Sequence, residues 1–176
     1  MRNIILKSFI IIPLFFTVLF SNEPLSIGFW NAENLFDLID DPKKNDDEFA
    51  LGGRKNVDQK IYDLKIQNCS EVVSDLDVDI LGLCEVENIK VLNDLNTAYP
   101  KRNYDIIHYD SPDSRGIDNA LMYDKNRFQV ISSKAIPNTL DDGAKTRDLL
   151  YVYGKYQNIT LHIYINHWPS NYGGRE

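Results

Sequence analysis

The stretch that decides the fold is Val78–Glu85, VDILGLCE, in which uncharged residues run from Ile80 to Cys84 before the carboxylate of Glu85. A nearly continuous apolar run of this length is typical of a β-strand that is buried on both faces. A buried carboxylate is costly unless it is paired, protonated or bound to a cation. The stretch therefore predicts a central strand that ends in a carboxylate in need of a partner.

One helix is expected before this strand in the sequence and another after it. Apolar positions recur at helical intervals from Val57 to about Asp77, and Asn88–Tyr99 predicts a second helix that Pro100 stops. The other expected strands are Leu25–Asn31, Tyr104–Tyr109, Ile117–Tyr123 paired antiparallel with Phe128–Ser133, and Leu149–Tyr156 paired with Ile159–Asn166 across Gln157 and Asn158. Early helices and later strands indicate an α+β fold with more than one sheet.

Apolar rows on several predicted strands end in polar groups. Residues two apart share a face of a strand, so the row of Leu81 and Leu83 continues to Glu85. The corresponding rows of three other strands end in Asn31, Asp110 and His167. If the strands lie side by side, these groups collect at one rim of the core, although strands also end in polar residues simply because they reach water. An amide oxygen such as that of Asn31 suits a hard cation beside one carboxylate.

His167 and two arginines are the remaining candidates for chemistry. A carboxylate such as Asp110 could hold the tautomer of His167 as a general acid or phosphate donor, although a lone histidine is usually structural. Arg115 and Arg147 lie in loops beside strands, where either guanidinium could hold a phosphate through two hydrogen bonds. Salt bridges to Asp118 and Asp148 explain the two arginines equally well.

Five segments in this order carry a resemblance to a known family: FWNAENLFD, LCEVEN, DSPDSRGIDNALMYD, KTRDLL and INHWPSNYGG. The chain resembles the endonuclease/exonuclease/phosphatase superfamily over Leu25–Glu176, and its bacterial extracellular nuclease-like branch most of all. The resemblance implies a four-layer α/β/β/α sandwich of the DNase I type, with two sheets packed face to face and helices outside. It also implies divalent-metal-dependent hydrolysis of phosphate esters.

The resemblance assigns roles to particular residues. Asn31 and Glu85 resemble the metal-site asparagine and glutamate, which implies Mg²⁺, with Ca²⁺ or Mn²⁺ as alternatives. His167 is similar to the histidine of the pancreatic deoxyribonuclease type, with Asp110 as its carboxylate partner. Arg147 is similar to the phosphate-contacting arginine of that enzyme, and Arg115 and Asn166 are further candidates for phosphate contact.

The sequence also departs from the family. A Gly-Asp-x-Asn block and a final Asp-His pair, which complete the site in family members, do not occur in it. Residues 22–176 are therefore expected to be the N-terminal portion of the domain, incomplete at the C-terminus, unstable alone, and weak or inactive as a nuclease. The alternatives are a phosphatase or lipid phosphodiesterase of the same fold, or a noncatalytic exported fragment.

The N-terminal 21 residues are expected to be a signal peptide. Arg2 and Lys7 precede or flank the apolar run Phe9–Phe20, which is shorter than the roughly 17 to 25 residues that span a bilayer. A secreted or periplasmic protein is expected, with an uncleaved anchor as the alternative. Removing this segment would take the formal net charge from -7 to about -9, which argues against tight electrostatic binding of polyanions.

Two smaller features complete the sequence analysis. Cys69 and Cys84 are the only cysteines, and two buried thiols are favoured over a disulfide because Cys84 lies in the apolar strand. No Cys/His cluster indicates zinc. The loop Asp40–Glu48 is dense in aspartate and could hold calcium, but its spacing matches no known cage, so a solvated insertion is favoured.

Overall fold

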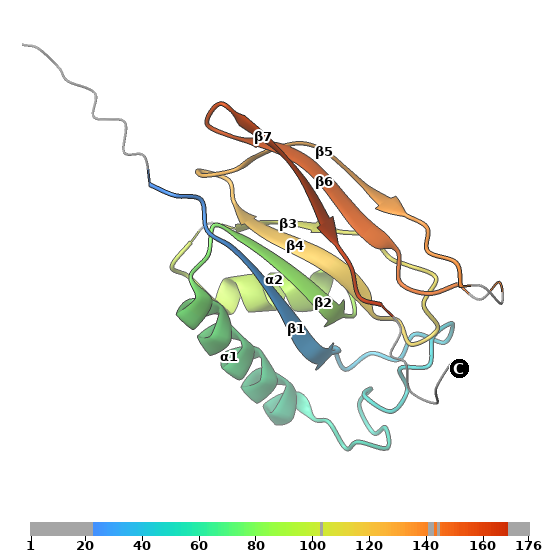
Figure 1. Ribbon diagram of the computed structural model, residues 1–176. Helices are drawn as coiled ribbons and strands as arrows, with labels where there is room; N and C mark the ends of the chain where they lie inside the picture. Colours follow the sequence, from blue (N-terminus) through green and yellow to red (C-terminus); the bar gives the residue numbers. More distant parts are fainter. Residues whose placement is uncertain (1–22, 103, 141–142, 144, 169–176) are drawn as a thin grey trace, which may run out of the picture.

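The computed structural model describes residues 23–102, 104–140, 143 and 145–168, so the expected signal peptide lies outside the described residues. The described residues form two helices and two sheets, and Figure 1 shows the helices beneath the stacked sheets. The elements in chain order are β1 (Ile27–Leu35), α1 (Gln59–Leu76), β2 (Ile80–Val86), α2 (Ile89–Ala98), β3 (Tyr104–His108), β4 (Asp118–Asp124), β5 (Gln129–Ile136), β6 (Leu149–Tyr156) and β7 (Ile159–Ile165). Among the described residues, no helix is long and apolar enough to cross a membrane.

The strands form two sheets, which confirms the expected α+β class. Sheet A has the order β1-β2-β4-β3, with β1 and β2 parallel and joined through α1, and the other pairs antiparallel. Sheet B is the antiparallel order β5-β6-β7. The expected hairpin of β6 and β7 is present, with Gln157 and Asn158 at its turn.

The expected antiparallel pair of Ile117–Tyr123 with Phe128–Ser133 is wrong, because β4 belongs to sheet A and β5 to sheet B. The backbone carbonyl of Asp124 accepts hydrogen bonds from the amides of Arg127 and Phe128 and so turns the chain. Phe128 is then buried between the sheets, where its ring occupies the space left by the missing side chain of Gly154. Because this ring is buried between the sheets, the chain continues from β4 of sheet A into β5 of sheet B and does not form a hairpin.

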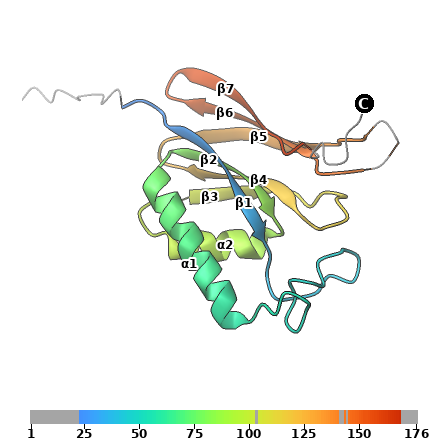
Figure 2. The same ribbon diagram turned by 60° about the horizontal axis from the view of Figure 1, so that its bottom comes forward.

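Two hydrophobic cores hold together the layers that Figure 2 shows. One lies between the helices and sheet A and includes Leu81, Leu83 and Val86. The other lies between the sheets and includes Ile80 and Ile165. Gly82 allows close approach of the sheets, because a Cβ atom there would lie 3.2 Å from both Ile165 and Phe29.

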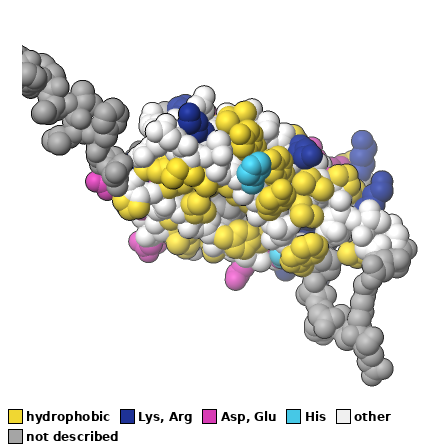
Figure 3. Space-filling model, turned by 45° about the horizontal axis from the view of Figure 1, so that its top comes forward, with side chains coloured by type: hydrophobic (Ala, Val, Ile, Leu, Met, Phe, Trp, Pro, Cys, Tyr) yellow, Lys and Arg dark blue, Asp and Glu magenta, His cyan; other side chains and the backbone are white. Residues whose placement is uncertain are grey.

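The described residues form three of the four layers that the resemblance implies. Both helices cover the outer face of sheet A, and no described helix covers the outer face of sheet B. Figure 3, turned so that the side with sheet B comes forward, shows hydrophobic side chains gathered there. Tyr151 and Tyr153 stack on His162 from neighbouring strands, and Tyr164 packs against Tyr151.

Local polar contacts explain where the helices begin and end. The side chain of Asp58 accepts a hydrogen bond from the Ile61 amide and so caps α1, which ends at Asp77 in a left-handed conformation with φ of 40°. Asn88 caps α2 in the same way through the amides of Lys90 and Val91. The strand β2 that follows α1 therefore starts at a defined point.

Asp79 anchors the start of sheet A. It is 3% exposed, and its carboxylate accepts hydrogen bonds from the amide and hydroxyl of Ser26, from Arg102 and from Arg127. This cluster ties the residues before β1 to those before β2 and aligns the two parallel strands.

Both cysteines are buried and free, which confirms the expectation of two thiols. Burial raises the pKa of Cys84 to about 11 and also raises the pKa of Cys69. Neither thiol is a ready nucleophile, because the thiolate is the reactive form.

Candidate active site at the rim between the sheets

The C-terminal ends of β1 and β2 are irregular at adjacent positions. The register of β1 shifts between Asn31 and Leu35, and that of β2 shifts between Cys84 and Val86. Glu33, Asn34 and Glu85 have left-handed backbones with φ of 53°, 62° and 57°. Irregularities of this kind redirect side chains, and strained residues of this kind cluster at functional sites.

The irregularity at Glu85 corrects the alternation expected from the sequence. Leu81 and Leu83 face the helices, so strict alternation would also turn Glu85 toward the helices. Val86 packs against the helices instead, which means that the alternation slips by one residue at Glu85. Glu85 consequently faces the rim between the sheets, where the residues after β7 lie.

Glu85 and His167 are brought together at this rim. Their side-chain atoms Oε1 and Nε2 are 3.5 Å apart, and both side chains are largely shielded from solvent. The second carboxylate oxygen of Glu85 accepts a hydrogen bond of 3.1 Å from the amide of Asn34. Burial and the nearby guanidinium of Arg147 lower the pKa of His167, against the opposing effect of Glu85. The imidazole is therefore neutral at neutral pH.

Two asparagines flank Cys84 on the neighbouring strands. Asn31 of β1 and Asn119 of β4 are both in register with Cys84, so the three side chains share the face that looks toward sheet B. The Oδ1 atom of Asn31 accepts a hydrogen bond from the amide of Glu33. The Oδ1 atom of Asn119 is buried and has no hydrogen-bond partner among the described residues, while its Nδ2 atom donates to the carbonyl of Asp148.

Sequence reasoning missed Asn119. The signal that could have found it is its position in the apolar run of β4, where it alternates with Leu121 and Tyr123, both of which pack in the core between the sheets.

Arg147 is buried and binds the loop that carries Asp113. Its Nη1 atom donates to Asp113 at 2.9 Å, and its Nη2 atom donates to the carbonyl of Trp168 at 3.5 Å. Its Nε atom is buried without a partner among the described residues. The expected ion pair with Asp148 is not observed. In this arrangement Arg147 fixes the segment that carries His167, and its expected contact with phosphate stays a prediction.

Arg115 is the more accessible of the two arginines. Its side chain is 47% exposed and lies 3.8 Å from Asp113, in place of the expected pairing with Asp118. It is also close enough to His167 to contribute to lowering the pKa of that imidazole. Arg115 is therefore free to contact a bound anion beside His167.

The structure does not bring Asp110 to His167. Ile106 packs in the core on the helix side of sheet A, so the row that it shares with His108 and Asp110 lies on the face opposite to the rim. Asp110 is exposed and lies 3.9 Å from His108, whose other ring nitrogen contacts Asp118 at 3.1 Å. These three side chains are grouped closely enough to hold a metal ion. A role for Asp110 in orienting His167 is thus incompatible with this geometry.

Asn166 immediately precedes His167, and its Oδ1 atom is buried without a hydrogen-bond partner in the described part of the chain. Its expected contact with phosphate stays a prediction. The Oδ1 atom of Asp148 and the Nδ1 atom of His167 are also buried without a partner among the described residues. Buried polar atoms normally find partners, so these atoms are available to a ligand.

The two stacked sheets thus bring a carboxylate, an imidazole and a guanidinium to one rim. The family model described as Endonuclease/Exonuclease/phosphatase family matches residues 26–176, and the chain belongs to this family. Enzymes of the family generally depend on a divalent metal ion.

Solved structures of low sequence identity have a similar fold. The selenomethionine form of TDP2 from Caenorhabditis elegans has a TM-score of 0.54 at 18% identity, over 83% of this chain and 35% of that chain. A second structure of TDP2 from C. elegans gives 0.51 at 17%, over 80% and 34%. A humanized D. rerio TDP2 gives 0.49 at 17%, over 80% and 45%. This chain thus spans less than half of the length of each of these proteins. No curated protein matches the chain.

Proposed function

We propose that the chain carries catalytic groups of a divalent-metal-dependent phosphodiester hydrolase that acts on nucleic acid, as a nuclease of the bacterial extracellular branch. The observation that carries the proposal is the meeting of Glu85, from β2 of sheet A, with His167, which follows β7 of sheet B, at a distance of 3.5 Å. Nucleic acid is favoured because endonucleases and exonucleases are two of the three activities in the family's description.

The residues at the rim fit a hard divalent cation such as Mg²⁺. Glu85 supplies a carboxylate with one oxygen directed at His167, and Asn119 supplies a buried amide oxygen without a partner among the described residues. Asn31 supplies a second amide oxygen on the same face. Oxygen donors of this kind suit Mg²⁺, Ca²⁺ or Mn²⁺. When bound, such an ion would offset the negative charge of a reacting phosphate.

The remaining groups act on the phosphate and its surroundings. A neutral imidazole still carries one N–H group, so His167 can donate a hydrogen bond to a phosphate oxygen. Arg115 is exposed and can contact the same anion. Arg147, held by Asp113, positions the segment after β7, and burial together with this guanidinium lowers the pKa of His167. The chain's negative net charge suits brief contact with a polyanion rather than tight binding.

The proposal is tested by cleavage of supercoiled plasmid, single-stranded DNA and RNA in the presence of Mg²⁺ or Mn²⁺, followed by removal of the metal with a chelator. Glu85→Gln and His167→Ala should each lower the metal-dependent rate by about 100-fold or more. Glu33→Gln is the matched control, because Glu33 is exposed beside the same irregular backbone and should keep the wild-type rate.

The outcomes separate the candidate substrates. Cleavage of sphingomyelin or an inositol phosphate without cleavage of nucleic acid would mean that the same catalytic side chains belong to a lipid phosphodiesterase or phosphatase. A wild-type rate in Glu85→Gln would overturn the proposal. No metal-dependent hydrolysis of any of these esters would instead favour the noncatalytic alternative. Export is part of the proposal, and fractionation of cells that express the whole chain would test it.

A further inference from the structure

The outer face of sheet B carries a continuous row of aromatic rings. The ring of His162 stacks on Tyr153 with the ring centroids 4.8 Å apart, and on Tyr151 with the centroids 5.9 Å apart. Tyr164 extends the row, because its ring centroid lies 5.0 Å from that of Tyr151. The hydroxyl of Tyr151 is also 2.7 Å from Nδ1 of His162. This contact fixes the two rings relative to each other.

The register of the β6–β7 hairpin places these four rings on the side away from the core. Tyr151 pairs with Tyr164, and Tyr153 pairs with His162. Val152, between the two tyrosines of β6, is buried in the core between the sheets, so alternation turns its neighbours outward. His162 and Tyr164 are exposed, Tyr164 by 55%. The four rings together are called the aromatic face, and Figure 3 shows the side of the molecule on which they lie.

The charge on sheet B is opposite in sign to that of the whole chain. The strands β5, β6 and β7 contain no Asp or Glu, although the chain has 26 acidic residues and a formal net charge of -7. They carry two exposed lysines, Lys134 and Lys155. The Nζ atom of Lys134 lies 5.7 Å from the ring centroid of Tyr151, its partner in register. Lys155 follows Tyr153 by two residues and so shares its face.

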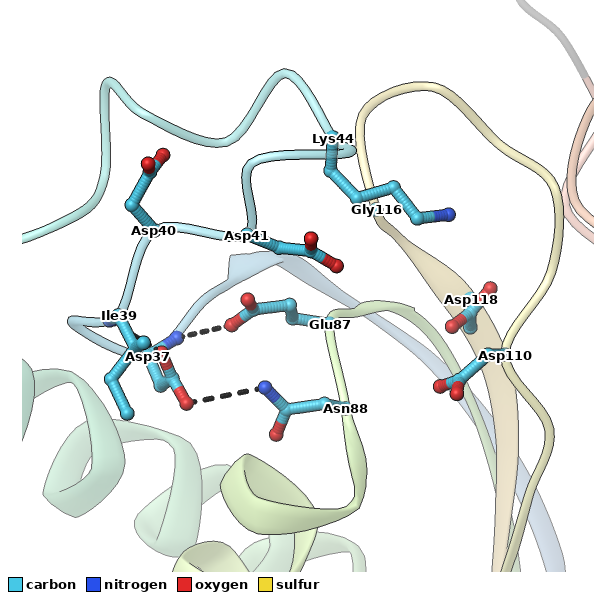
Figure 4. Close-up of a pocket in the computed structure, with 10 residues that line it drawn as sticks. All are labelled: Asp37, Ile39, Asp40, Asp41, Lys44, Glu87, Asn88, Asp110, Gly116 and Asp118. Atoms are coloured by element: carbon cyan, nitrogen blue, oxygen red, sulfur yellow. Dashed lines mark hydrogen bonds between the residues drawn. The ribbon is translucent and has the colours of Figure 1, made fainter.

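Acidic side chains gather on another part of the molecule, around a pocket of about 300 Å³. Lys44 belongs to the lining of this pocket, but its ammonium group donates hydrogen bonds of 2.8 Å to the backbone carbonyls of Ser111 and Asp113. A polyanion is therefore repelled from this pocket and attracted to sheet B. Figure 4 shows the pocket and its six carboxylates, which belong to Asp37, Asp40, Asp41, Glu87, Asp110 and Asp118.

Aromatic rings beside lysines suit a single-stranded nucleic acid, because bases stack on the rings and phosphates attract the ammonium groups. Two copies of this chain packed through the same face would bury Lys134 and Lys155 of both copies with no carboxylate on these strands to pair with them. A helix would need an apolar stripe to pack against. The outward positions of sheet B also include the polar residues Gln129, Ser132 and Thr160.

We propose that the aromatic face binds single-stranded nucleic acid by stacking of its bases, with the two lysines of sheet B in contact with phosphates. The bases of a single strand can be splayed onto aromatic side chains, whereas the bases of a duplex are held in its own stack. Single strands are therefore preferred over duplexes. Two lysines displace few counterions, so binding depends only weakly on salt and is compatible with the negative net charge of the chain.

The aromatic face ends beside the rim. Tyr164 precedes His167 by three residues, which span at most about 11 Å. A strand stacked on Tyr164 can therefore pass over the end of β7 and place a phosphate near His167. In the proposed hydrolase the aromatic face would hold nucleotides that flank the scissile phosphate, and this role alone rests on the proposed function. Binding of the strand itself requires no hydrolysis.

Binding of a fluorescent oligothymidylate of about ten nucleotides to the whole chain tests the proposal. Fluorescence anisotropy is measured in EDTA, so that no metal-dependent hydrolysis occurs. The wild type should bind the single strand about 10-fold or more tightly than a duplex of the same length. Tyr164→Ala should weaken binding of the single strand by about 10-fold or more, because one stacked base is lost. Tyr164→Phe keeps the ring and should keep the wild-type affinity.

Three further variants separate stacking from other contacts. Tyr164→Leu keeps an apolar side chain without a ring, so it should weaken binding as much as Tyr164→Ala. Ile61→Ala is the matched control, because Ile61 is 47% exposed on α1, which covers the other sheet, and this variant should bind like the wild type. The logarithm of the association constant should fall against the logarithm of salt concentration with a slope of about -1.4, and of about -0.7 in Lys134→Gln.

Several results would overturn the proposal. They are absence of binding by the wild type, wild-type affinity in Tyr164→Leu, and loss of binding in Glu85→Gln with full binding in Tyr164→Ala, which would place the strand at the rim. A wild-type dimer that Tyr164→Ala converts to a monomer in analytical ultracentrifugation would assign the aromatic face to a second copy. Tyr164 is exposed, so its variants should keep the circular dichroism spectrum of the wild type.

Failure of this proposal and failure of the proposed function give different results. Binding in EDTA without metal-dependent cleavage of any ester would refute the hydrolase and leave the aromatic face as a binding surface. Metal-dependent cleavage of the small diester bis(p-nitrophenyl) phosphate, without binding of oligothymidylate, would refute only the aromatic face. Tyr164→Ala should cleave this small diester at the wild-type rate, because the diester is too short to reach both Tyr164 and the rim.

Discussion

The backbone at Glu85 makes a sharp prediction about stability. Glu85→Ala and Glu85→Gly both remove the carboxylate, so the difference between them reports only on the backbone. In an ordinary strand glycine is less stable than alanine by about 0.5–1 kcal/mol, because glycine loses more conformational freedom on folding. At a φ of 57° the order should reverse, since a side chain in the left-handed region costs about 1–2 kcal/mol.

The structure sets the size of the reversal. β2 pairs with β1 and β4, and both pairings shift in register at Glu85. Neither variant therefore removes a regular contact between strands. Subtracting the entropic loss of glycine from the relief of strain, each taken at the middle of its range, makes Glu85→Gly more stable than Glu85→Ala by about 0.75 kcal/mol. For a chain of this size that corresponds to a Tm difference of about 1–4 °C.

Urea unfolding followed by tryptophan fluorescence measures this difference, provided that the two variants have equal m-values. Lys155→Ala and Lys155→Gly form the control pair, because Lys155 is an exposed residue of β6 without a positive φ. There glycine should be the less stable of the two. If Glu85→Gly were less stable than Glu85→Ala by as much as the control pair, the left-handed conformation and the redirection of Glu85 to the rim would both be refuted.

Three further predictions concern buried charges and thiols. Asp113→Asn leaves Arg147 without its buried counter-charge and should lower the free energy of unfolding by about 3–5 kcal/mol in urea titration; a loss below about 1 kcal/mol would contradict the pairing. Burial opposes the ionisation of Asp79, but its hydrogen bonds from Ser26, Arg127 and Arg102 outweigh it and lower the pKa of this carboxyl below the usual 3.8. The contribution of the Asp79 carboxylate to stability is therefore present above about pH 4 and is lost as the pH falls through the lowered pKa. The Tm of Asp79→Asn should consequently fall less steeply with acid than the Tm of the wild type. An unchanged acid dependence of the Tm would exclude the cluster. Cys69 and Cys84 should react with a thiol reagent only as the chain unfolds, and rapid reaction of the folded chain would contradict their burial.

The sequence predicted the elements well because each has a local physical signature. The apolar run before Glu85 indicated β2, helical spacing of apolar residues indicated α1, and the segment that Pro100 stops indicated α2. The turn at Gln157 and Asn158 indicated the hairpin of β6 and β7. Pairing between β4 and β5 was predicted wrongly, because proximity in sequence does not reveal that Phe128 must be buried between two layers.

The candidate site was predictable only in part. Parity along a strand correctly suggested a polar rim, but it placed Asp110 beside His167, although β3 turns that row to the helix side. It also relied on an unbroken alternation up to Glu85, which the register shift interrupts. The pairing of Arg147 with Asp113 and the exposure of Arg115 depend on loops that come together only in the folded chain.

The sequence by itself determined which residues are apolar, which segments are helix or strand, and that the carboxylate of Glu85 at the end of the apolar run needs a partner. Those properties depend on neighbours within a few positions along the chain. Only the tertiary structure decided which sheet each strand joins, which face Glu85 presents and which groups meet His167. These depend on hydrogen bonds and packing between segments far apart in the sequence, and a shift of one residue in register moves a side chain from one face of a sheet to the other.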